Sequence, residues 1–392
     1  MSSRDSVDRL RLATRGSALA LRQAGLVEEQ LGSRRLSVEL VTVETTGDQV
    51  RDELIHRLGK TGAFVRSLDE KVLDGELDAA VHSMKDMPTD GPPELVVAGV
   101  PERAAAADVL VTPDGRSLDE LPEGATVGTS SLRRGAQLLV ARPDLTIEPL
   151  RGNVDTRVEK LLAPSLQREH QARVEAAEDS EDDTDADDTD ADGNDDDGDE
   201  REYDRSPQEW FDDLAEIERR ALERDVDTGF DAICLAEAGL DRSGLLGQLH
   251  DERLNPAWFV PAPGQGAIAV MALDGESAEL IYDGIDHPPS RVETTVERTI
   301  LAELGGGCVA PVGIHASLRG DVVSTTVRVL SRDGEREVRE SRDLPVERHA
   351  EAAVSFAADL AERGAADLIQ DARREEPDDA KREEPDDGNG GE

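Results

Sequence analysis

The stretch that decides the fold is FVRSLDEKVLDGELDAAVHSMKDMPTD, residues 64–90. Residues 64–77 predict a helix, and the apolar run AAV at residues 79–81 predicts a short buried strand. Directly after that strand the chain presents Lys85 and Asp86 side by side, before a proline ends the element. A helix that leads into a buried strand is half of a βαβ unit. The stretch therefore predicts an α/β fold with polar residues at a strand end.

The same alternation extends in both directions. Residues 17–31 predict a helix for which Ser17 is the N-cap. Strands are predicted at 10–15, 36–45 and 94–100. The pattern restarts after Pro101, with strands predicted at 108–112, 125–130, 145–150 and within 230–240, and helices at 131–142 and 153–163. This rhythm predicts mostly parallel, doubly wound sheets.

The C-terminal part predicts a separate α+β unit. A strand at 266–273 is expected to return to the first domain. It is followed by a helix around 290–304, strands near 312–317, 321–331 and 335–343, and a helix at 346–369. We expect domain 1 over residues 1–102 and 264–286, domain 2 over 103–263, domain 3 over 287–370 and a disordered acidic tail over 371–392.

Composition excludes several classes of function. The 392 residues carry 88 acidic and 44 basic side chains, a formal charge of −44. Nucleic-acid binding is excluded, because phosphates demand a basic footprint. The charge is typical of a salt-rich cytoplasm, where a short Debye length screens repulsion; an acidic surface for a basic partner is the alternative. With no bilayer-spanning apolar run and no recognisable secretion signal, we expect a cytoplasmic protein without membrane contact or structural disulfide.

Residues 175–202, EAAEDSEDDTDADDTDADGNDDDGDERE, contain almost nothing apolar. So little apolar surface cannot offset the entropy lost on ordering, so we expect a disordered insertion within about residues 170–205. Its aspartates could also buffer metal ions, but low-complexity solvation is the favoured interpretation, and we expect no metal site. The tail repeats REEPDD and is expected to be disordered for the same reason.

Three basic clusters stand out in so acidic a chain. In each, a strand ends, small or hydroxyl residues open a helix, and arginines stand nearby. The clusters are Arg15 with Ser17, Thr129 and Ser131 with Arg133 and Arg134, and Arg151 with Asn153 and Arg157. Helix N-termini attract anions, and guanidinium groups bind carboxylates or phosphates through paired hydrogen bonds. One Arg-Arg pair is more often a solvated helix face, but three clusters at strand ends predict a ligand with several negative groups.

Lys85 and Asp86 allow two interpretations. They form either an exposed ion pair of little energetic value, or a carboxylate beside the arginines that stabilises a developing cation or moves a proton. Cys308, in GGGCVAP at 305–311, is either a buried small residue or, as its glycines favour, a reactive or modified thiol. Cys234 lies within an apolar strand and is predicted to be a core residue.

Seven stretches together resemble the motifs of one family, porphobilinogen deaminase, also called hydroxymethylbilane synthase. They are TRGSALALRQ (14–23), AVHSMKDMPT (80–89), GTSSLRRGAQL (128–138), LRGNVDTR (150–157), LAEAGLDR (235–242), PAPGQGAIAV (261–270) and LGGGCVAPVG (304–313). The resemblance covers nearly all of residues 8–370 apart from the acidic insertion. Combined with the charge, it implies a halophilic archaeal source.

The resemblance implies two domains similar to type II periplasmic binding proteins, hinged around a cleft, and a small α+β domain. It implies a transferase that condenses four porphobilinogen molecules head to tail, releases ammonia each time and yields hydroxymethylbilane. It further implies a monomer with a covalent dipyrromethane cofactor, held by a thioether bond to Cys308.

By the same resemblance, Asp86 is the catalytic carboxylate, which assists loss of ammonia, stabilises the azafulvene cation and handles the pyrrole protons. The positions that match cofactor-holding residues are Lys85, Thr129, Ser131, Arg133 and Arg134. Those that match residues binding the substrate or growing chain are Arg15, Ser17, Arg151, Arg157 and Arg242, with Asn153 as the turn residue. Lys60 matches a flexible lid.

Two departures stand out. Asp155 occupies a position where the family has a small residue, so it either weakens anion binding slightly or faces solvent, and the acidic insertion replaces a short connection. A non-catalytic two-lobed protein that closes on an anionic ligand is the alternative function. It accounts for the arginines but not for Asp86 or Cys308. An acidic interaction scaffold is a third reading and fits only the insertion and the tail.

Overall fold

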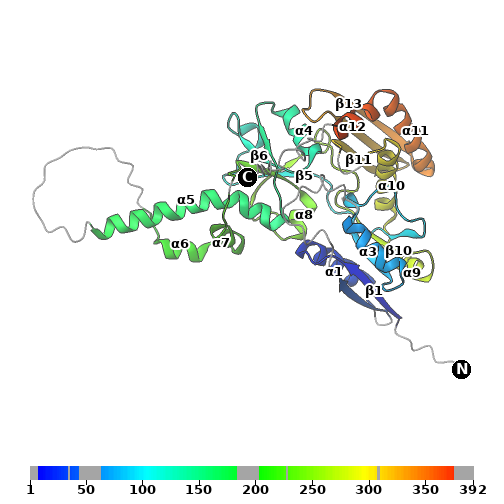
Figure 1. The fold of residues 1–392 in the computed structure, drawn as a ribbon, viewed down its shortest axis with the longest axis horizontal. Helices are drawn as coiled ribbons and strands as arrows, with labels where there is room; N and C mark the ends of the chain where they lie inside the picture. The colour runs from blue at the N-terminus through cyan, green and yellow to red at the C-terminus, as the bar shows by residue number, and fades with distance from the viewer. Residues whose placement is uncertain are drawn as a thin grey trace, which may run out of the picture.

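The computed structural model describes residues 8–33, 36–43, 63–182, 203–226, 228–306 and 310–374. Within these residues the strands form two five-stranded sheets and one three-stranded sheet. Each sheet lies in its own body of the molecule, and helix α5 (Val154–Asp182) projects away from all three (Figure 1). The predicted lid around Lys60 and the Cys308 position lie outside the described residues.

The first sheet has the order β2-β1-β3-β10-β4. Its strands are β1 (Asp8–Thr14), β2 (Leu36–Thr42), β3 (Ala79–Ser83), β4 (Leu95–Gly99) and β10 (Ile268–Leu273). Helices α1 (Ala18–Leu31) and α9 (Glu276–Ile285) pack their apolar residues into one core cluster, and α3 (Ala63–Leu73) contributes to another. The predicted cap of α1 is confirmed, because Ser17 Oγ accepts a hydrogen bond from the Ala20 amide at 3.3 Å.

The second sheet has the order β7-β6-β8-β5-β9. Its strands are β5 (Asp108–Thr112), β6 (Thr126–Gly128), β7 (Thr146–Glu148), β8 (Ala232–Ala236) and β9 (His250–Leu254). Its helical elements are η2 (Leu118–Glu120), α4 (Leu132–Ala141), α5, α7 (Glu216–Leu222) and α8 (Glu237–Arg242). Apolar residues of α5, α7 and α8 fill one core cluster, and Leu138 of α4 packs in the other.

The two sheets share one topology, which confirms the predicted pair of similar α/β domains. The expectation of mostly parallel sheets is wrong, however. Strands β10 and β5 each run antiparallel to both of their neighbours, and the remaining pairs are parallel. A parallel strand would need a crossover connection, usually a helix, back to the other end of the sheet. Both β5 and β10 are instead entered directly by segments that cross from one sheet to the other.

The third sheet confirms the predicted α+β unit. Its antiparallel strands are β11 (Val312–Arg319), β12 (Val322–Leu330) and β13 (Glu337–Pro345). They pack with α10 (Pro288–Glu303), α11 (His349–Glu362) and α12 (Ala365–Arg374), and η3 (Val346–Arg348) leads into α11. The single helix expected at 346–369 is wrong, because Gly364 separates α11 from α12. Its φ of 95° lies in the left-handed region that ends helices.

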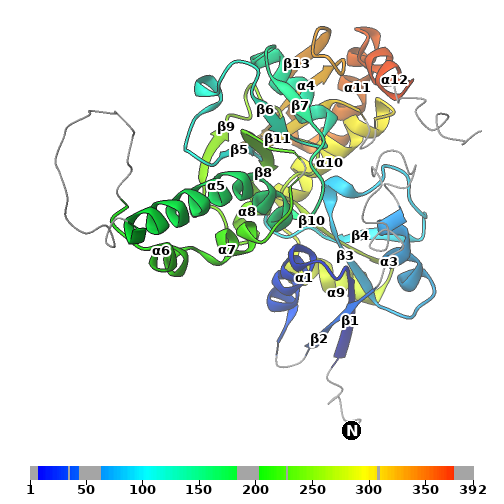
Figure 2. The same cartoon turned by 60° about the vertical axis from the view of Figure 1, so that its left-hand side comes forward.

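Helix α5 runs much further than the helix expected at 153–163. Figures 1 and 2 show it extending as an arm, with α6 (Pro207–Asp213) and α7 returning along it. The expectation of disorder from about residue 170 is therefore wrong up to Asp182. Trp210 of α6 is buried against His170, and the Arg173 guanidinium lies 5.2 Å from its ring centre. This later segment supplies apolar contacts that the acidic stretch lacks.

Two crossing segments, residues 101–107 and 255–267, join the first two sheets. They touch where the Ala104 amide donates to the Gly266 carbonyl at 3.3 Å. Gly266 has a φ of 85°, and a Cβ there would lie 2.5 Å from the Ala104 oxygen. Only glycine fits such a contact. This contact holds the two crossing segments together, just before they lead into β5 and β10.

Candidate active site

Asp86 closes a single turn of 3-10 helix, η1 (Met84–Asp86), which follows β3 directly. Its side chain is 59% exposed, and the Lys85 Nζ lies 3.8 Å from its Oδ1. The turn is tied to the sheet by the Met84 amide, which donates to the Ala267 carbonyl at 3.0 Å. β1 and β3 are parallel, so Arg15, just after β1, lies at the same sheet edge as Asp86.

The second sheet presents its own polar edge. β6 and β7 are parallel, so the residues that follow them meet at one end of the sheet. Ser131 caps α4 by accepting from the Arg134 amide at 3.4 Å, and Thr129 Oγ1 accepts from the Ser131 amide at 3.2 Å. Together they form a hydroxyl-lined helix N-terminus, which favours anions.

Arg133 and Arg134 are almost fully buried and share one carboxylate, that of Asp108. Asp108 Oδ2 accepts from Arg133 Nη1 at 2.7 Å, and Oδ1 accepts from Arg134 Nε at 2.8 Å. Arg133 Nη1 also donates to the Val260 carbonyl, and both guanidiniums approach Gln265 Oε1. Burial by itself would raise the pKa of Asp108, but the two guanidiniums outweigh it and lower that pKa. Arg133 is thus committed to internal contacts.

Arg151 and Arg157 flank the turn that opens α5. Gly152 in this turn has a φ of 111°, and its carbonyl accepts from Arg157 Nε at 2.8 Å. The Asn153 carbonyl accepts from the Arg157 amide and starts the helix. Among the described residues, the Arg151 guanidinium has neither a hydrogen bond nor an ion pair. Asp155 is partly exposed in the first turn of α5, so it is neither fully solvated nor buried.

Electrostatics connect the two polar edges. Burial alone would lower the pKa of Arg134, but Asp108 outweighs it, and Asp86 acts in the same direction as Asp108. Burial and the positive charge of Arg134 lower the pKa of Arg157 to about 10, while Asp86 opposes that shift. Arg157 therefore remains charged at neutral pH. The structure brings Asp86, Arg134 and Arg157 within electrostatic reach of one another, although they come from different sheets.

Arg242, at the end of α8, serves a different contact. Its Nη2 donates to the Gly266 carbonyl at 2.7 Å, and its own carbonyl accepts from Arg22 Nη1 of α1. The residue therefore links α8 to a crossing segment and to the first domain. Burial lowers the pKa of its guanidinium. Ser17, the N-cap of α1, is partly exposed, as is Arg15.

The two cysteines have different environments. Cys234 is fully buried in β8, which confirms the predicted core position, and burial raises the pKa of its thiol to about 12. Such a thiol is inert. Cys308 lies outside the described residues, between Gly306, which follows α10, and Ala310, which precedes β11.

Sequence reasoning missed a buried carboxylate that contacts both crossing segments and the third domain. Glu297 of α10 has no exposed surface and pairs with Arg103 at 2.8 and 3.0 Å. It also accepts from the amides of Gly264 and Ala316. One side chain thus joins α10, β11 and both crossing segments. Burial would raise the pKa of Glu297, but Arg103 and His315 outweigh it and lower that pKa. An acidic residue within a helix of so acidic a chain carries no signal of this role.

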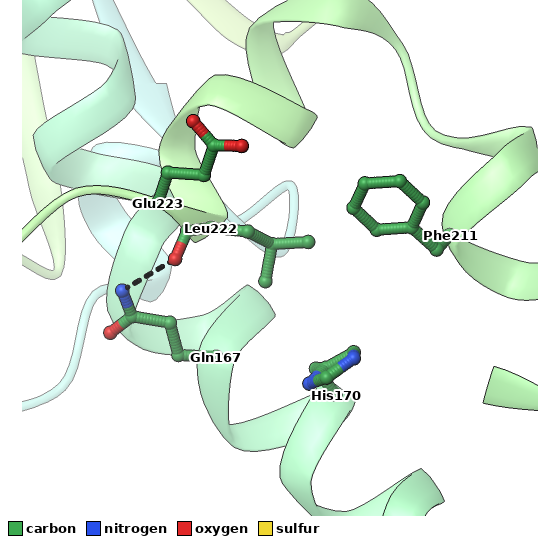
Figure 3. A pocket seen from close by; sticks show the side chains of 5 residues that line it. All are labelled: Gln167, His170, Phe211, Leu222 and Glu223. Atoms are coloured by element: carbon green, nitrogen blue, oxygen red, sulfur yellow. Dashed lines mark hydrogen bonds between the residues drawn. The ribbon is translucent and has the colours of Figure 1, made fainter. Parts of the chain in front are cut away.

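Two cavities are lined by described residues, and neither lining includes a predicted site residue. One, of about 210 Å³, lies on the α5 arm between Gln167, His170, Phe211, Leu222 and Glu223, where Gln167 donates to the Leu222 carbonyl (Figure 3). The other, of about 410 Å³, lies between α3 and the loop after η1, with Asp69 and Asp90 among its lining residues. The described part of the chain contains no group of three potential metal ligands and no helix able to cross a membrane.

The fold and the site define a two-lobed α/β protein with a third small domain, whose cationic groups face a carboxylate. The chain belongs to the porphobilinogen deaminase family. The family model for "porphobilinogen deaminase, dipyromethane cofactor binding domain" matches residues 10–177 and 216–280, and that for the C-terminal domain matches 292–363.

Curated relatives agree with the family models. A probable porphobilinogen deaminase of Halobacterium salinarum is 51% identical over 381 residues, covering 91% of this chain and 96% of the relative. One of Methanococcoides burtonii is 37% identical over 353 residues, covering 90% and 93%. The methionine-binding protein MetQ, a solved structure, shares 13% identity at a TM-score of 0.33, covering 71% of this chain and 90% of MetQ. So weak a likeness adds nothing to the assignment.

The family defines the activity. This chain is a transferase that converts porphobilinogen to hydroxymethylbilane with release of ammonia, and it uses a dipyrromethane cofactor. The alternative of a non-catalytic binding protein is not favoured. The acidic composition and the Halobacterium relative together indicate a halophilic archaeal origin.

Proposed function

We propose that Asp86 is the carboxylate that performs the chemistry of this reaction. Each condensation expels ammonia from the aminomethyl group of porphobilinogen and leaves a cationic azafulvene. A carboxylate at that point stabilises the cation and takes up the proton released when the new carbon–carbon bond forms. The single observation that carries the proposal is the electrostatic coupling of the exposed Asp86 to Arg134 and Arg157, which belong to the other lobe.

The cationic residues around Asp86 are proposed to bind the carboxylates of the substrate and growing chain. Every pyrrole unit carries an acetate and a propionate, so each addition brings two further negative charges. Arg151, whose guanidinium has no partner in the described part of the chain, is the best placed to accept one. Burial and the charge of Arg134 both disfavour the charged form of Arg157, so this guanidinium gains most from an anionic partner. Arg15 and Ser17 are proposed to serve the same ligand from the first sheet.

The described residues fit the dipyrromethane cofactor in their donor chemistry. The N-terminus of α4, the Thr129 and Ser131 hydroxyls, and the nearby cations Lys85 and Arg134 are donors suited to a molecule with four carboxylates. When bound, the cofactor supplies the pyrrole ring to which the first substrate is joined. Cys308 is the proposed attachment residue, because its glycine-flanked position matches the motif and the remaining cysteine is buried.

We propose different duties for the two adjacent arginines. Arg134 responds to the charge of Asp86 and is retained as a cofactor-binding residue. Arg133 donates its hydrogen bonds to Asp108 and the Val260 carbonyl. Its contribution to cofactor binding is therefore indirect, through the position of Asp108 and α4. Arg242 likewise acts by holding α8 against Gly266. The three domains with the limits given above, a monomeric state and a cytoplasmic location complete the proposal.

Product identification after incubation with porphobilinogen tests the proposal, with Asp86→Asn as the informative variant. The amide keeps the shape but loses the charge, so turnover should fall by roughly 10²–10⁴-fold. Substrate binding and cofactor mass should be retained. Asp90→Asn, an exposed neighbour on the same loop, is the matched control and should turn over normally. An Asp86→Asn enzyme working at nearly the native rate would remove Asp86 from the mechanism.

A further inference from the structure

A side chain from the third domain holds the turn that carries Asp86. Arg298 of α10 reaches across to η1 and the residues just after it, where its Nη2 donates to the Pro88 carbonyl at 2.7 Å. Its Nη1 lies 3.3 Å from the Met87 carbonyl oxygen and 3.4 Å from that of Met84. The three carbonyls bracket Asp86 on both sides along the chain. One guanidinium therefore hydrogen-bonds to the backbone on either side of the proposed catalytic carboxylate.

The turn needs such a contact because its own backbone bonding is slight. The β3–β10 ladder ends at Ser83, and Met84 donates to the Ala267 carbonyl. Beyond that, the Met87 amide closes the turn by donating to the Met84 carbonyl at 3.2 Å. A single 3-10 turn of three residues is marginal by itself. Hydrogen bonds from a charged donor are roughly twice as strong as those between neutral groups.

The helix that carries Arg298 is itself firmly fixed. Its neighbour Glu297 accepts from the Gly264 amide and pairs with Arg103, so both crossing segments are bound to this point of α10. Gly264 packs in turn on η1, because a Cβ there would lie 3.3 Å from the Lys85 amide nitrogen. Two consecutive residues of α10 thus set the position of the crossing segments and of the turn together. The same helix leads to the glycines that precede Cys308.

We propose that Arg298 is a positioning residue for Asp86, which fixes the carboxylate relative to α10. The inference rests on the proposed role of Asp86. Arg298 acts on the backbone of η1 and performs no chemistry itself. Without the Arg298 contacts the turn should be more mobile. A misplacement of the Asp86 carboxylate by about 1 Å can lower the rate roughly 100-fold.

The test compares two arginines of the same helix. Arg291 also donates to carbonyls of the first domain, those of Val97 and Ala98, but these lie on β4 and not beside Asp86. Arg298→Met should lower kcat roughly 100-fold with little change in KM, because it removes alignment and not substrate contacts. Arg291→Met should destabilise the protein while kcat stays near native. Arg298→Lys should recover part of kcat, since the charge remains but the planar fork is lost.

Hydrogen exchange supplies a readout that does not depend on activity. Amides of residues 84–87 should exchange faster in Arg298→Met and Arg298→Lys, while those of β3 keep their protection. In Arg291→Met the faster exchange should appear around residues 97–100 instead. Native exchange at residues 84–87 in both Arg298 variants, or a loss of kcat no larger than in Arg291→Met, would overturn the proposal.

The two proposals fail differently. If Asp86→Asn turned over normally, the role of Asp86 would be lost, yet the exchange data would still show whether Arg298 holds the turn. If Asp86→Asn collapsed and the Arg298 variants behaved like Arg291→Met, only the positioning role would be lost.

Discussion

Asp86 and Arg157 belong to different sheets, yet the charge of Asp86 opposes the lowering of the Arg157 pKa. An exposed carboxylate after β3 therefore acts on a guanidinium at the start of α5, across the boundary between the lobes. Removing either charge therefore changes the electrostatic environment of the other side chain. A polyanionic ligand bound to Arg157 would also be subject to the negative charge of Asp86.

Replacing Arg157 or Arg151 with Leu should stall chain growth rather than prevent it from starting. Early condensations should proceed, and covalent enzyme–substrate complexes should then accumulate as carboxylates are left without a cation. Lysine at either position should restore only part of the activity. Mass spectrometry of the intact protein reads the ladder directly. Arg168→Leu, further along α5 at a position where Nε donates to the Pro164 carbonyl, is the control. If both variants gave the native series of covalent enzyme–substrate complexes, the growing chain would have to bind elsewhere.

Cys308→Ser should fold but carry no covalent cofactor, because a hydroxyl does not replace a thiolate as nucleophile at neutral pH. Cys234→Ser should keep the cofactor, since that thiol has a pKa of about 12 and is buried in β8. Intact mass separates the two variants. A dipyrrole still attached to Cys308→Ser would assign the attachment to another residue.

Asp108→Asn should destabilise the protein by about 3–5 kcal/mol at neutral pH, because Arg133 and Arg134 lose their shared buried partner. The pKa of Asp108 is lower in the folded state than in the unfolded chain. Its stabilising contribution is therefore present above the ordinary aspartate pKa of about 3.9 and is lost as the pH falls through the lower folded value.

Chemical unfolding between pH 7 and pH 3 checks this expectation. The gap between native and Asp108→Asn proteins should be widest near neutrality and should narrow towards pH 3. Asp283→Asn, at an exposed position of α9, should cost less than about 0.5 kcal/mol at any pH. A constant gap across the pH range would contradict the assigned shift.

Stability should rise with salt. The formal charge of −44 repels itself over a Debye length of about 30 Å at 0.01 M salt but only about 3 Å at 1 M. Thermal melts across an ionic-strength series should show this trend, and removing residues 183–202, rich in aspartate, should flatten it. A melting temperature independent of salt would count against adaptation to a saline cytoplasm.

Much of this protein follows from its sequence. Apolar runs fix the strands that supply both α/β domains, because periodicity and burial are local properties. The Ser17 cap and the delivery of Asp86 at the end of β3 are equally local. The motif order also predicts the family. The length of α5 was not predictable, because His170 and Arg173 in its second half contact Trp210, which lies beyond the insertion.

The tertiary structure alone decided how these pieces meet. The antiparallel entry of β5 and β10 follows from the crossing segments, and no pattern within either strand encodes it. Arg133 looks like an anion-binding residue in the sequence, yet in the fold it forms an ion pair with Asp108, 25 residues away. Arg298 and Glu297 are ordinary helix residues until the fold places the Asp86 turn and both crossing segments against them. Hydrogen bonds between residues so distant in the chain form only once packing has placed both partners. Local sequence determines the elements and their chemistry, and packing determines which charges are consumed and which remain for the ligand.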